Sequence, residues 1–172
     1  AHLYERFLGN SLQDWAASAC ITLAILAFGI ALRGLVLAKL RRRDGALTAR
    51  RWQDTFLIAF ENTSFFFILV LALHFGVENL ELHAKVAKFR DYLFFFVLFY
   101  QTGIWLTTAL DFFGQSYIRE TVTKEPARAT TLSAMIILGD VAIWVVMVLL
   151  FLANCGANIS ALVAGLGVGG VA

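Results

Sequence analysis

Four long apolar stretches constrain this chain more than any other feature. Each contains roughly the 20 residues that a helix needs to cross a bilayer, and they cover residues 15–37, 55–75, 92–113 and 130–153. Hydrophobic residues make up 60% of the 172 residues, whereas a soluble domain is about half apolar. The single proline favours long helices. The sequence therefore predicts an all-α membrane protein with four transmembrane helices.

The distribution of positive charge predicts the orientation. The net charge of +2 is too small to indicate a nucleic-acid partner. Nine Lys and Arg residues lie in loops 39–51 and 114–129, against four in the N-terminal segment and loop 76–91. Since Lys and Arg accumulate on the cytoplasmic side, we expect the N-terminus outside, in an inner membrane of bacterial type. The run Arg41–Arg43 could bind anionic lipid. Alternatively, its only role is to set the orientation of the chain in the membrane.

Four polar residues within the spans are candidates for a functional role, because ionisable groups at membrane depth are costly. Asp140 and Gln101 fall at similar depth on antiparallel neighbours, so we expect an interhelical hydrogen bond between them. The alternative is a proton relay through Asp140. Arg33 and Glu61 lie near the inner ends of their helices, where they could form an ion pair. Alternatively, Arg33 extends alone to the headgroups.

The sequence contains no pattern typical of an enzyme or a cofactor site. No nucleophile–base pair or carboxylate pair has plausible spacing, so we predict no catalytic residue and no cofactor. His74 and His83 lie near Glu78 and Glu81, but this spacing matches no familiar metal-ligand motif. We interpret this loop as solvated and predict no metal.

The last fifteen residues, Asn158–Ala172, have an unusual composition. They read NISALVAGLGVGGVA and contain no charge, proline or aromatic residue. Glycine inside a helix costs about 1 kcal/mol relative to alanine, and in a membrane the close approach of another helix can offset this cost. Small residues dominate one helical face, at 161, 164, 165, 169 and 172. A phosphate-binding loop is excluded because no Gly-Lys-Ser/Thr follows.

This pattern, preceded by the polar turn 154–160, resembles the pore-lining helix of the small-conductance mechanosensitive channel family. The resemblance covers about fifteen residues and implies a larger member with extra N-terminal helices. It implies that Val171 forms the first of two apolar constriction rings, on the side of the helix that carries Val163 and Gly167. Neighbouring copies would pack against each other through a row of small residues: Ala164, Gly165, Gly167, Gly169 and Gly170. Val168 lies in the same row, where the resemblance leads us to expect a small residue.

The resemblance also implies a function and partners. We expect residues 1–153 to form peripheral helices and residues 154–172 to form the turn and the start of the pore helix, followed by a cytoplasmic C-terminal domain. The protein would then be a homoheptameric, tension-gated ion channel that responds to osmotic stress, with lipids, ions and other copies as its partners. Two alternatives stay open: a proton-coupled secondary transporter that uses Asp140, and a non-conducting structural membrane subunit.

Overall fold

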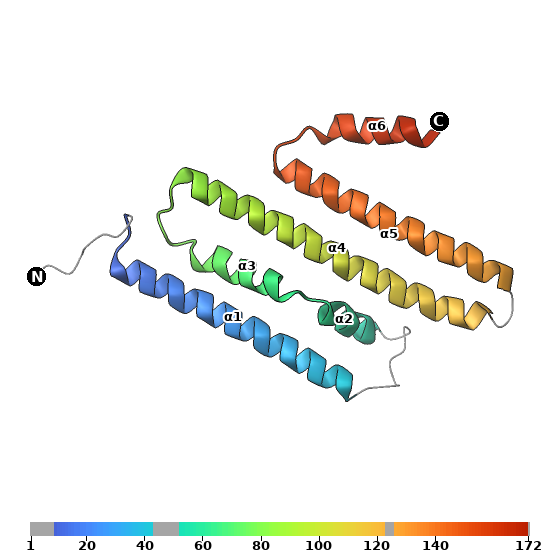
Figure 1. The fold of residues 1–172 in the computed structure, drawn as a ribbon, viewed down its shortest axis with the longest axis horizontal. Coiled ribbons are helices and arrows are strands. Elements are labelled where there is room, and N and C mark those ends of the chain that lie inside the picture. The colour runs from blue at the N-terminus through green and yellow to red at the C-terminus, as the bar shows by residue number, and fades with distance from the viewer. Residues whose placement is uncertain (1–8, 43–51, 123–125, 172) are drawn as a thin grey trace, which may run out of the picture.

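The regular structure of the protein is helical. The computed structural model describes residues 9–42, 52–122 and 126–171 (Figure 1). The helices in these ranges are α1 (Leu12–Arg41), α2 (Trp52–Glu61), α3 (Phe65–Gly76), α4 (Ala84–Val122), α5 (Pro126–Asn154) and α6 (Ile159–Val171).

Three of these helices, α1, α4 and α5, are long and apolar enough to cross a membrane. Each extends beyond its predicted apolar stretch, α4 most of all, because polar residues continue the helix at both ends. The closing stretch forms α6 as far as Val171, and Ala172 lies outside the described residues. The chain is therefore a membrane protein with three candidate spans.

The predicted second span, residues 55–75, is not one continuous helix. It is broken between α2 and α3, and the two parts are bent by 83°. The break falls at Asn62, Thr63 and Ser64, residue types that bond the backbone locally and favour helix ends. Ser64 is the N-cap of α3, and its side chain accepts a hydrogen bond from the N–H of Phe66. A fourth span exists only if the bent pair crosses as a unit.

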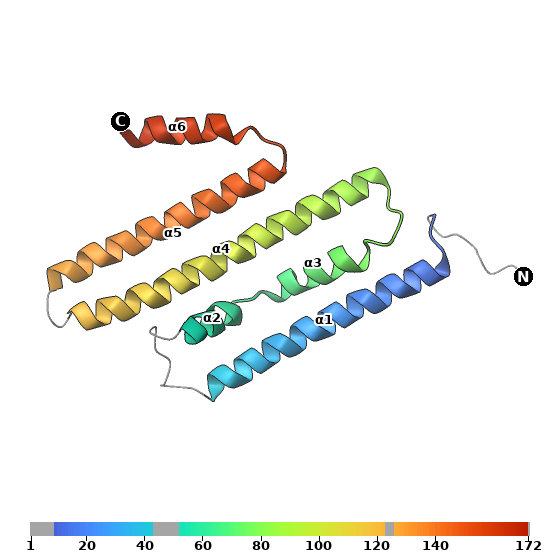
Figure 2. The same ribbon diagram turned by 180° about the vertical axis from the view of Figure 1, so that it is seen from behind.

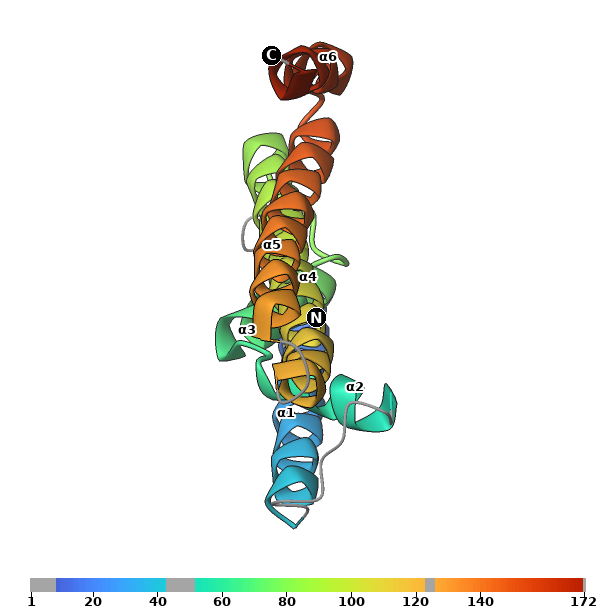
Figure 3. The same cartoon turned by 90° about the vertical axis from the view of Figure 1, so that its right-hand side faces the viewer.

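The three long helices and α3 form a layer that is nearly one helix thick. In Figure 1 and in the view from behind in Figure 2, α1, α3, α4 and α5 lie side by side in that order. Figure 3 shows the same layer from its end, with α2 and α3 displaced to opposite sides of the column formed by the long helices. Helix α4 lies at the centre, since it contacts α2, α3 and α5.

Glycines bring the helices of this layer close together. A Cβ atom added at any of five glycines would meet a side chain of the neighbouring helix, as expected where small residues let membrane helices approach. Between α1 and α3 the pairs are Gly29 with Ile68 and Gly76 with Thr22, and between α4 and α5 they are Gly103 with Trp144, Gly114 with Ile136 and Gly139 with Leu110.

The turn between α5 and α6 is closed by hydrogen bonds. Gly156 has φ +82°, a left-handed conformation that glycine adopts at little cost. The N–H of Gly156 donates to the carbonyl of Ala153, and that of Ala157 donates to the carbonyl of Leu152. This is the Schellman pattern that ends a helix. The side chain of Asn158 then accepts from the N–H of Ser160, and α6 begins at Ile159, three residues after the glycine.

Candidate functional site

Helix α6 has few neighbours within one chain. Among the described elements it contacts α5 alone. A Cβ atom added at Gly165 or Gly167 would find no atom within 4 Å. Leu162 and Val163 are 43% and 50% exposed. The first turns of the closing helix therefore present an open, small-residue surface.

Of the remaining predicted pore residues, the structure describes the side chain of Ala164 alone. Ala164 lies on α6 and is exposed. The residues from Val168 to Val171, which include Gly169 and Gly170, continue the same helix, but their side chains lie outside the described part. The constriction ring expected at Val171 thus stays a prediction.

Asp140 lies on α5 beside a groove that α6 borders. Its Oδ1 atom is buried and has no hydrogen-bond partner. The groove has a volume of about 560 Å³ and an almost wholly apolar lining of Ile137, Asp140, Val141, Trp144, Val145, Val148, Leu149, Leu152 and Leu162. An unpartnered carboxylate in such surroundings is costly.

The hydrogen bond expected between Gln101 and Asp140 is not formed. Gln101 is 1% exposed, and its Oε1 accepts from the N–H of Ser64 at 3.0 Å. Its Nε2 donates to the carbonyl of Asn62 at 3.1 Å. The side chain thus satisfies backbone groups that the break leaves without helical partners. Because both ends of the Gln101 amide are used in this way, it does not bond Asp140 of α5.

Further side chains of α4 hold the break from neighbouring turns. The indole Nε1 of Trp105 donates to Thr63 Oγ1 at 3.2 Å, and Asn62 Nδ2 donates to Thr108 Oγ1 at 3.3 Å. The Trp105 ring stacks on Phe60 of α2, with centroids 5.6 Å apart, and meets Phe67 of α3 edge to face at 5.5 Å. One face of α4 therefore fixes both helices of the bent pair.

The ion pair that Arg33 and Glu61 could form is also absent from the described structure. Within the described residues neither side chain has an ion-pair partner. The Nε atom of Arg33 is buried without a hydrogen bond, whereas Glu61 is exposed at the end of α2. Helix α2 still contacts α1, but the chain bends directly after Glu61, which therefore lies at the exposed end of α2.

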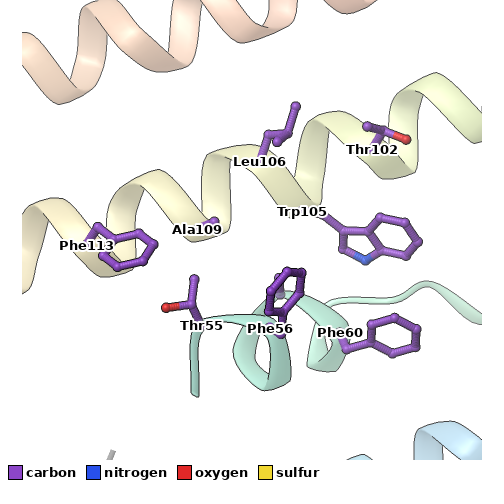
Figure 4. A pocket seen from close by; sticks show the side chains of 9 residues that line it. Thr55, Phe56, Phe60, Thr102, Trp105, Leu106, Ala109 and Phe113 are labelled. Atoms are coloured by element: carbon purple, nitrogen blue, oxygen red, sulfur yellow. The ribbon is translucent and has the colours of Figure 1, made fainter. Parts of the chain in front are cut away.

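Helix α2 divides the surface of α4 into an apolar and a polar side. On the apolar side a pocket of about 450 Å³ is lined by Thr55, Phe56, Ala59, Phe60, Thr102, Trp105, Leu106, Ala109 and Phe113 (Figure 4). On the polar side a smaller pocket of about 280 Å³ is lined by Ile58, Thr108, Asp111, Phe112, Gln115, Ser116 and Arg119.

At the other end of α3, His74 lies in an aromatic and acidic environment. Its ring stacks on Phe94 with centroids 4.0 Å apart, and its Nδ1 lies 3.8 Å from Asp91 Oδ1. Asp91 also accepts two hydrogen bonds from Arg90. Within the described ranges, no group of three or more His, Cys, Asp or Glu residues is placed to hold a metal ion.

Comparison with known proteins gives no relative for this chain: no family model, curated protein or solved structure matches it. Its function is therefore inferred from the chain's own residues and from the resemblance of residues 158–172.

Proposed function

We propose that the chain is a subunit of a homo-oligomeric ion channel opened by membrane tension, and that α6 begins its pore-lining helix. The observation that carries the proposal is the empty space around Gly165 and Gly167. Helix-interior glycine costs about 1 kcal/mol against alanine, and close contact with another backbone can offset it. Among the described residues Gly165 and Gly167 lack such contact, so we assign it to neighbouring copies.

In this arrangement several copies of α6 surround an axis, seven by resemblance to the channel family. The small face of Ala164 and Gly165 packs against the next copy, and the apolar side chains of Val163 and Val171 face the axis. A ring of apolar side chains can stop ions by dewetting, even where the opening is wider than an ion. Separation or rotation of the α6 helices would open it.

The thin layer of long helices suits a response to tension. Large apolar side chains along it are exposed, such as Phe28 at 69% and Leu138 at 68%, as expected for lipid contact. Tension shifts the equilibrium between the closed and open channel only if the two states differ in a property on which tension acts. That property is the area that the protein occupies in the membrane plane. A layer one helix thick exposes most of its surface to lipid and can tilt or spread to supply that difference.

Asp140 favours a second candidate, a proton-coupled transporter. A buried carboxylate oxygen without a partner, beside an apolar groove, is a feature of proton-carrying sites in membranes. The variant Asp140→Asn separates the two functions. It would abolish proton-coupled transport, whereas in a channel it would change the opening tension at most. A non-conducting structural subunit would show neither activity.

The direct test is patch-clamp recording of the full-length protein in liposomes under stepped suction. A tension-gated channel gives unitary currents whose open probability rises with pressure. Silence up to membrane rupture, from protein shown to be inserted and oligomeric, would overturn the proposal. In active channels Val171→Asn should lower the opening pressure, because a polar ring is more easily wetted.

A matched pair of glycine variants tests the role of α6. In one chain both Gly165 and Gly34 have open space around them. Gly165→Leu and Gly34→Leu should therefore both leave the folding of a single subunit nearly unchanged. Only Gly165→Leu should weaken oligomers, measured by cross-linking in membranes, and change the opening pressure. Equal effects of the two variants would show that α6 does not form the contact between copies.

A further inference from the structure

The polar pocket between α2 and α4 has a composition that lipid cannot satisfy. Five of the seven residues that line it are polar. Two of these, Asp111 and Arg119, carry charges, and no ion pair joins them in the described structure. Ionisable side chains within a membrane span face a bundle interior or a water-filled cavity. The pocket therefore needs a polar occupant.

This pocket leads along α4 toward the helix break. Arg119 lies at the end of the candidate span 84–119. Thr108 lies eleven residues earlier, about 16 Å deeper at 1.5 Å per residue. At that depth Thr108 accepts the hydrogen bond from Asn62, which is exposed. Non-helical backbone at membrane depth is tolerated where protein covers it or where it lines water. Gln101 bonds the carbonyl of Asn62 and so covers part of the break. The exposed part of Asn62 includes its amide side chain, which donates to Thr108, and an exposed polar side chain at this depth calls for a surface that lines water.

We propose that the polar side of α2 is a water-filled crevice, which admits water and small polar solutes from the Arg119 end of α4 to Asn62. Its volume of about 280 Å³ holds several water molecules, each of which takes about 30 Å³ in the liquid. Side-chain oxygens and nitrogens along the crevice supply the two to four polar partners that each buried water needs. The crevice lies within one subunit and does not depend on whether α6 lines a pore.

The apolar pocket on the other side of α2 provides matched controls. Leu106 and Phe113 line that pocket, each two residues from a crevice residue, Thr108 and Gln115 respectively. Two residues on a helix differ by about 3 Å in height and about 200° in direction. Each pair therefore compares two faces of α4 at nearly one depth.

The experiment measures how fast single cysteines react with a charged, membrane-impermeant methanethiosulfonate reagent. The full-length protein, with Cys20→Ala and Cys155→Ala, is placed in proteoliposomes that are permeabilised so that the reagent reaches both faces. The variants are Thr108→Cys and Leu106→Cys at one depth, and Gln115→Cys and Phe113→Cys at the other. Reaction is followed by the mass shift, and full reaction in SDS verifies that each thiol is intact.

Both crevice variants should react at least about ten times faster than their partners, because the thiolate is the reactive form and an apolar environment suppresses it. Equal rates within each pair would overturn the proposal. Reaction at position 115 without reaction at 108 would overturn it as well, because water would then stop short of the break. Since Gln115 is exposed, its variant should keep the fold, which size-exclusion chromatography verifies.

Discussion

Removing the Gln101 side chain from the helix break should destabilise the protein more than any ordinary polar-to-apolar change in α4. In Gln101→Leu, the N–H of Ser64 and the carbonyl of Asn62 lose their partner. A stranded buried polar group costs about 1–3 kcal/mol, whereas interhelical hydrogen bonds in membrane proteins average about 0.6 kcal/mol. Two bonds at a site that is 1% exposed give an expected loss of about 2–3 kcal/mol.

The loss can be measured by unfolding the protein with SDS in mixed micelles. Trp105 is a useful probe, since its ring stacks on Phe60 and its indole N–H bonds Thr63 across the break. In a background where the other three tryptophans are replaced by phenylalanine, its fluorescence and the near-ultraviolet circular dichroism should change in one transition. A loss of about 2–3 kcal/mol lowers the folding equilibrium constant by about 30- to 150-fold.

Thr102→Val is the matched control on the same helix. The Thr102 hydroxyl donates to the carbonyl of Leu98 in its own helix, so its loss strands no group of another helix. We expect a change within about 0.5 kcal/mol. If Gln101→Leu costs no more than Thr102→Val, the two bonds of Gln101 do not hold the break, and the reasoning fails.

Three further predictions follow from single sites. Gly103→Val should cost about 1–3 kcal/mol in the same SDS unfolding, because its Cβ would press on a tryptophan ring of α5 at 3.1 Å, while Gly34→Val, with open space around it, should change stability little. Asp140→Leu should raise stability by about 1–3 kcal/mol, since Oδ1 lacks a partner; a loss of stability would reveal a partner in another copy. Asn10→Ala should speed amide hydrogen exchange at Glu81, whose N–H donates to Asn10 at 2.7 Å, and unchanged exchange would show that this contact does not protect the amide.

The long apolar helices were predictable from composition, but the break was not. Over residues 55–75 the summed hydropathy is high enough to hide Asn62, Thr63 and Ser64 at its centre. The available signal was local: three consecutive residues that favour caps over helix interiors. Average hydropathy over about 20 residues dilutes three polar positions, whereas the backbone responds to them individually.

The hydrogen-bond partners of Gln101 could not be predicted from the sequence either. Depth matching placed Gln101 level with Asp140, and it correctly identified a polar side chain that must be bonded. Depth alone does not say on which face of α4 the side chain lies, and that face is set by the glycine contacts with α5. Gly103, two residues away, faces Trp144 of α5, so Gln101 points away from α5 and toward the bent pair.

The helix end at Gly156 has a mechanical consequence. A flexible linker between α5 and α6 would absorb displacement, but this connection is only four residues long and is closed by hydrogen bonds at both ends. A rotation of the last turn of α5 therefore swings the axis of α6 through a similar angle. With 13 residues at about 1.5 Å each, α6 acts as a lever arm, and a small rotation at the elbow becomes a displacement of several ångströms at its far end.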